Sequence, residues 1–83
     1  MHEMLVMAFD STQQALRAEM LLEFAEVDID LFPTPKEITA GCALSIQFSE
    51  SSLSLVKEII KNESVEIRGI FILTDTGYDN ITI

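Results

Sequence analysis

The residue best suited to chemistry in this chain is Cys42, its single cysteine. It lies near the end of the stretch Phe32–Ala43, which has neither helical nor strand periodicity and holds both prolines. A cysteine thiolate is a nucleophile, and reactive groups concentrate in loops that a rigid scaffold positions. Cys42 is therefore a candidate nucleophile. The alternative is that it is a small buried apolar residue, with Pro33 and Pro35 only stiffening the connection.

Several other functions are excluded by composition. A metal site needs a ligand cluster, and His2 and Cys42 are the only strong nitrogen and sulfur ligands in the chain. No glycine-rich phosphate loop is present, so we expect neither a metal nor a cofactor. The net charge of −9, with five scattered basic residues, argues against nucleic acid and anionic membranes as partners. No apolar run has the length of a membrane helix.

The length of 83 residues predicts one domain, 1–83, with a core over about 4–74. Residues 75–83 are expected to form an extra edge strand or a tail. One cysteine cannot form an intrachain disulfide, and the short apolar start follows Glu3 instead of a basic region, so we expect a cytoplasmic protein.

Hydrophobic periodicity predicts four strands and two helices. Ser11 and Gln14 have the spacing of a capping box at the first helix start. On that helix Leu16, Met20 and Phe24 form a second apolar row, which we expect to pack on the other helix; a subunit or partner contact is the alternative. The predicted ranges are strands 4–9, 27–31, 44–48 and 65–74, and helices 12–26 and 52–61.

The order strand-helix-strand-strand-helix-strand predicts an α+β protein with a ferredoxin-like βαββαβ sandwich. Its four-stranded antiparallel sheet has both helices on one face. Alternation places Val27, Ile29 and Leu31 inward, and Ile70 and Ile72 on the open face. An open face that carries these residues and part of the first strand is expected to be covered by a second subunit, giving a homodimer.

This topology places Cys42 near the turn Asp10–Thr12, where the first helix begins. Free N–H groups and the positive end of the helix dipole would stabilise a thiolate there. Lys36 would add to this effect, whereas Asp10 and Glu37 would oppose it. Gly41 is expected to leave one side of the thiol unshielded.

Three stretches resemble the Se/S (selenium/sulfur) carrier protein-like family, a bacterial and archaeal family of unknown function: Phe9–Ala15, Phe32–Ile38 and Gly41–Phe48. The resemblance spans about residues 4–73. Two positions differ from the family's usual residues, since Lys36 replaces arginine and Ala43 replaces glycine. A lysine cannot hold an oxyanion with two parallel hydrogen bonds as arginine can.

The resemblance implies that Cys42 accepts a persulfide or selenopersulfide from a donor of the cysteine desulfurase type. The residues expected to shape its binding site are Ser11, Thr12, Thr34, Lys36 and Gly41. The competing hypothesis is a binding or regulatory module, a dimer whose Pro33–Cys42 loop holds a partner or ligand. Both hypotheses describe a carrier or binding protein and not a stand-alone enzyme. Only the carrier hypothesis requires that the Cys42 thiol is exposed.

Overall fold

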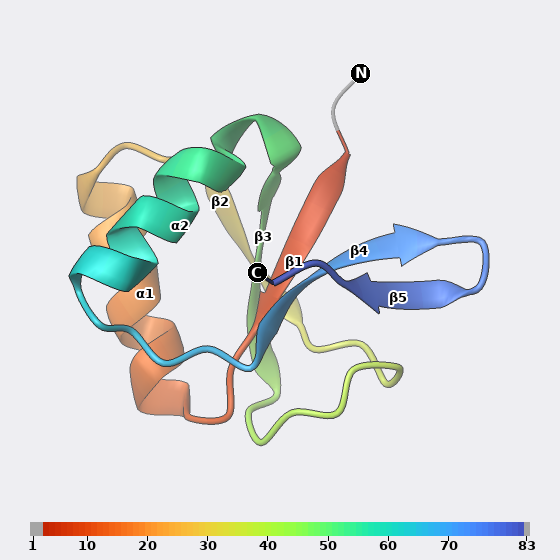
Figure 1. The fold of residues 1–83 in the computed structure, drawn as a ribbon. Helices are drawn as coiled ribbons and strands as arrows, with labels where there is room; N and C mark the ends of the chain where they lie inside the picture. The colour runs from red at the N-terminus through yellow and green to blue at the C-terminus, as the bar shows by residue number, and fades with distance from the viewer. Residues whose placement is uncertain (1–2, 83) are drawn as a thin grey trace.

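A five-stranded antiparallel sheet carries two helices on one face (Figure 1). The computed structural model describes residues 3–82, so the expectations for His2 and for residue 83 lie outside the described part. The strands are β1 (Met4–Ala8), β2 (Ile29–Pro33), β3 (Leu44–Ser49), β4 (Gly69–Thr74) and β5 (Gly77–Asn80). The helices are α1 (Thr12–Phe24), the short 3-10 turn η1 (Glu50–Ser52) and α2 (Leu53–Asn62).

The strands lie in the order β2-β3-β1-β4-β5, and every neighbouring pair is antiparallel. The α+β class is confirmed, but the predicted count of four strands is wrong. The fifth strand, β5, lies within the 75–83 stretch and forms a hairpin with β4. Gly77 has φ +124, a conformation that a side chain disfavours, and the Thr74 hydroxyl donates to the Gly77 carbonyl at 2.9 Å. This turn returns the chain along β4.

The main core lies between the helices and the sheet, and it includes the completely buried residues Leu5, Phe9, Leu22, Ile46, Phe48 and Val56. Ile70 and Ile72 belong to this core, so their predicted placement on the open face is wrong. The strand begins at Gly69, not at Val65. Val65 and Ile67 precede it in irregular backbone and pack on the same core, which moves the alternation by one residue.

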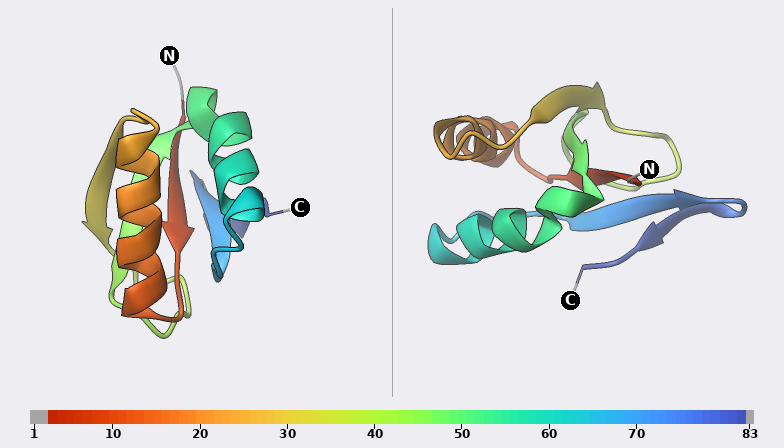
Figure 2. Two further views of the ribbon diagram at one scale, coloured as in Figure 1. Left: turned by 90° about the vertical axis from the view of Figure 1, so that its left-hand side faces the viewer. Right: turned by 90° about the horizontal axis from the view of Figure 1, so that it is seen from above.

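The face of the sheet without helices is covered in part by the connection between β2 and β3. Seen from above in Figure 2, this yellow-green loop runs on the side opposite the helices. Its Ile38 is 5% exposed and packs with Val6 and Ala8 of β1. Phe71 and Tyr78 pack against the same cluster. The apolar part of the first strand, expected to need a second subunit, is therefore buried within one chain.

Helix α1 and strand β2 both differ from prediction by about two residues. The helix ends at Phe24 because Glu26 takes φ +61, outside the right-handed helical region, and the Val27 N–H donates back to the Leu22 carbonyl at 2.9 Å. Strand β2 therefore begins at Ile29. Leu31, predicted to point inward, is 47% exposed because β2 is an edge strand.

The second apolar row of α1 is exposed. Leu16, Met20 and Phe24 are 49%, 67% and 90% accessible, so the prediction that they pack on the other helix is wrong. Arg17 of α1 instead reaches toward the end of α2, where its guanidinium lies 3.9 Å from the Glu63 carboxylate. The row consequently lies on the outer side of α1.

We expect Phe24→Ala to change the free energy of unfolding by less than about 0.5 kcal/mol, because an exposed side chain loses little contact on truncation. Urea unfolding at two protein concentrations measures this. A loss above roughly 1 kcal/mol that grows with concentration would contradict the prediction, since it would mean that an associated chain covers Phe24.

Candidate functional site

Cys42 lies in the loop that joins β2 to β3, two residues before β3 begins. The start of β3 and the start of α1 lie at the same end of the sheet (Figure 1). Its N–H donates to the Phe9 carbonyl at 3.1 Å, which ties the loop to the residue after β1. The side chain is 4% exposed and packs in the main core. The exposed thiol that the carrier hypothesis requires is therefore absent from this structure, as the alternative of a small buried residue expects.

Two polar groups contact the sulfur atom. Thr12 Oγ1 lies 3.2 Å from Cys42 Sγ, and the Leu44 N–H donates to Sγ at 3.3 Å. Thr12 is the first residue of α1, so the cysteine lies against the helix start, where the topology places it. The surroundings of Cys42 are thus apolar on the core side and polar toward Thr12 and Leu44.

Gly41 allows the loop to approach the turn after β1 closely. A Cβ at this position would lie 2.6 Å from the Asp10 carbonyl oxygen, closer than atoms in contact permit. The Gly41 N–H donates to Asp10 Oδ1 at 2.9 Å. Glycine is required here by this close approach, and it does not leave the Cys42 thiol open on one side.

Thr34 fastens the other end of the loop to the same cysteine. Its hydroxyl donates to the Cys42 carbonyl at 3.0 Å and lies 2.6 Å from the hydroxyl of Ser45. The Thr34 N–H donates to the Ala43 carbonyl at 2.8 Å. Ser45 is completely buried, so its hydroxyl depends on Thr34. Sequence analysis did not include Ser45 in this site. The only sequence signal for it is a polar residue in β3, the strand that pairs with β2, and Thr34 directly follows β2.

Ser11 and Gln14 form half of the predicted capping box. The Gln14 N–H donates to Ser11 Oγ at 3.4 Å, whereas the Gln14 side chain accepts from the Glu66 N–H at 3.2 Å. Ser11 therefore caps α1 and forms no hydrogen bond with Cys42. Gln14 connects the helix start to the segment before β4.

Charged residues lie in the loop before Cys42 and in the turn after β1. Lys36 and Glu37 are exposed in the loop, and within residues 3–82 neither forms a hydrogen bond or ion pair with Cys42 or its contacts. The Asp10 carboxylate is 3.6 Å from the Arg68 guanidinium. Sequence analysis did not include Arg68 in the site. The structure thus brings Thr12, Thr34 and Gly41 to Cys42, and leaves Ser11 and Lys36 apart from it.

Over the described residues, no group of three or more histidine, cysteine, aspartate or glutamate side chains is arranged to hold a metal ion. The two helices of residues 3–82 are too short and too polar to cross a membrane.

Comparison with known proteins gives one family. No curated protein and no solved structure matches this chain. The sequence pattern of the family described as "Putative Se/S carrier protein-like" matches residues 4–72. This range includes β1, both helices, the loop with Cys42 and most of β4. The match covers most of the chain, and the protein therefore belongs to the Se/S carrier protein-like family.

Proposed function

We propose that the protein carries sulfane sulfur or selenium on Cys42. The observation that carries this proposal is the polar contact of Cys42 Sγ with Thr12 Oγ1 and the Leu44 N–H at the start of α1. Both groups are able to donate to a thiolate or to the terminal atom of a persulfide, and family membership supports the assignment. Neither a metal nor a cofactor is needed for this exchange.

The reaction is thiol exchange on a sulfane sulfur. The Cys42 thiolate attacks the terminal sulfur of a donor persulfide. The new bond joins Cys42 Sγ to that sulfur, the donor's S–S bond breaks, and the donor leaves as a thiolate. Nothing is oxidised or reduced overall, and a selenopersulfide reacts in the same way. Transfer to an acceptor reverses these steps.

Exchange requires that the loop opens, because Cys42 is only 4% exposed. Release of the cysteine breaks the bonds from its N–H to Phe9, from the Gly41 N–H to Asp10 and from the Thr34 hydroxyl. Local openings of this size cost less than global unfolding. We infer that a donor enzyme of the cysteine desulfurase type stabilises the open loop, with exposed Lys36 available to contact it. Ser11 then acts by holding the helix start in place.

The strand order and the single cysteine each support a further inference. The strand order β2-β3-β1-β4 with both helices on one face is consistent with a ferredoxin-like arrangement to which β5 is added at the edge. A single thiol that must stay reduced fits the cytoplasm.

The test is incubation with a cysteine desulfurase and cysteine, followed by intact mass measurement. The wild type is expected to gain the mass of one sulfur atom, reversed by a thiol reductant, and Cys42→Ser is expected to gain none. Ala43→Ser alters the exposed neighbour and keeps the thiol, so it should load like the wild type. An unmodified wild type under conditions in which the desulfurase turns over would contradict the proposal.

The burial of Cys42 favours a second candidate, a binding module in which the cysteine is only a core residue. In this case the Pro33–Cys42 loop holds a partner or ligand, and the protein is a homodimer. Sedimentation at high micromolar concentration distinguishes the two: a dimer with no sulfur loading supports the module, and a monomer contradicts it.

A further inference from the structure

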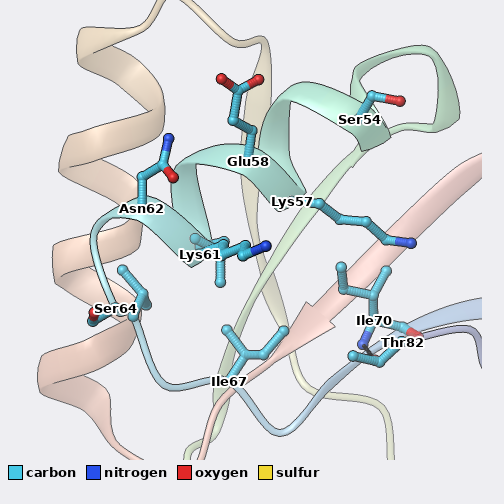
Figure 3. Close-up of a pocket in the computed structure, with 11 residues that line it drawn as sticks. Ser54, Lys57, Glu58, Lys61, Asn62, Ser64, Ile67, Ile70 and Thr82 are labelled. Carbon is cyan, nitrogen blue, oxygen red and sulfur yellow. Dashed lines mark hydrogen bonds between the residues drawn. The ribbon is translucent and has the colours of Figure 1, made fainter.

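A cleft of about 830 Å³ lies between α2, the segment before β4 and the end of the chain near Thr82 (Figure 3). None of its lining residues forms a hydrogen bond with Cys42. Small-molecule sites in proteins usually have volumes of about 300–1,000 Å³. The cleft is thus large enough for a small organic molecule, and it is independent of the proposed sulfur chemistry.

The floor of the cleft is apolar. Ile60, Val65 and Ile70 line it and are 9%, 7% and 1% exposed, and half-buried Ile67 lies beside them. These side chains belong to or pack on the main core, so the floor is held rigidly. An aliphatic or aromatic group that covers the floor gains free energy from removing apolar surface from water.

The rim of the cleft is positively charged. Lys57 and Lys61 lie four residues apart and therefore on one side of α2. Figure 3 shows both amines extending from the helix toward the cleft, with Lys57 above Ile70 and Thr82, whereas the carboxylate of Glu58 points away. The positive side of α2 therefore faces the apolar floor.

This arrangement is unusual for a chain with a net charge of −9 and only five basic residues. Both arginines are within reach of carboxylates, Arg17 of Glu63 and Arg68 of Asp10. Across residues 3–82, Lys57 and Lys61 form no ion pair. Two of the five cations thus meet at one apolar cleft with their charges available to a ligand.

We propose that this cleft binds an organic carboxylate with an apolar body. The carboxylate lies between the Lys57 and Lys61 amines, and the apolar body covers Ile60, Ile67 and Ile70. A lysine attracts an anion as a point charge, so recognition depends on charge and on apolar area more than on a fixed hydrogen-bond geometry. A cationic ligand is repelled by the rim, and a fully polar anion gains nothing from the floor.

The test is a titration of isotope-labelled protein with sodium octanoate, followed by amide chemical shifts. We expect saturable shifts at residues 57–61 and 65–70 below about 10 mM octanoate, the affinity expected of a ligand with so few atoms. Octanol, which lacks the charge, should bind at least about twofold more weakly at the same amides.

Variants with one charge removed make the test specific. Lys57→Gln and Lys61→Gln should each weaken octanoate binding about two- to fivefold, the range for an exposed charge pair. Lys36→Gln changes the net charge equally in the loop 34–43, outside the cleft, and should leave the affinity unchanged. The proposal is overturned by absent or unsaturable shifts at the cleft, by octanol binding as tightly as octanoate, or by an equal loss of affinity in Lys36→Gln.

Discussion

Gly41→Ala is expected to lower the free energy of unfolding by roughly 2–4 kcal/mol and to expose the Cys42 thiol. The new Cβ would lie 2.6 Å from the Asp10 carbonyl oxygen, and both atoms belong to backbone that has no rotamer to change. Relief of the clash moves the loop away, which weakens the hydrogen bonds from the Gly41 N–H to Asp10 and from the Cys42 N–H to Phe9. Overpacking costs about 1–3 kcal/mol, and each lost hydrogen bond about 1 kcal/mol.

Urea unfolding measures the stability of Gly41→Ala, and the rate of Cys42 alkylation under native conditions measures its exposure. When opening is fast, this rate follows the population of the open loop, so each 1.4 kcal/mol on the opening equilibrium is about a tenfold change. The control is Gly77→Ala. It introduces the same methyl group at φ +124 with no atom within 4 Å, so it should destabilise the β4–β5 hairpin and leave the native-state alkylation rate of Cys42 unchanged. Equal alkylation of Gly41→Ala and wild type would refute the closed-loop interpretation.

Thr34→Val is expected to lower stability by roughly 1–3 kcal/mol, because it leaves polar groups without partners. Valine keeps the branched shape but has no hydroxyl to donate to the Cys42 carbonyl or to pair with Ser45 Oγ. Ser45 is completely buried, so water cannot replace the missing partner without local opening. Native-state alkylation of Cys42 should accelerate about tenfold, since the same hydroxyl holds the loop closed.

A matched control for Thr34→Val is available in the same loop. Thr39 is exposed, and among the described residues its hydroxyl has no hydrogen bond, so Thr39→Val should change neither stability nor alkylation. If both variants behave alike, the effect comes from the loop's composition and not from the contact with Ser45. Both unfolding and alkylation are measured on the same preparations.

The position of Cys42 beside Thr12 was predictable from sequence, because strand and helix order determine which end of the sheet each loop occupies. The structure agrees, with Sγ 3.2 Å from Thr12 Oγ1. The burial of the thiol was not predictable in this way. It depends on specific bonds, such as the pairing of Thr34 with Ser45, and periodicity contains no information about them.

Sequence analysis also did not predict that the loop between β2 and β3 covers the helix-free face of the sheet. The irregular backbone at Val65–Arg68 shifts the alternation before β4 begins, so Ile70 was assigned to the wrong face. An aperiodic loop was not expected to cover a sheet, yet Ile38 packs on Val6 and Ala8. Propensity and periodicity describe helices and strands well, and they give little information on where a long connection lies.

The exposed row on α1 has a consequence for colloidal behaviour. Leu16, Met20 and Phe24 present a contiguous apolar stripe, and such stripes favour association between molecules. At neutral pH the net charge of −9 on each molecule opposes close approach. This repulsion disappears as the pH falls toward the isoelectric point near 4.2, and salt screens it at any pH. The acidity of the chain therefore acts as a barrier to self-association that mild acid or high salt removes.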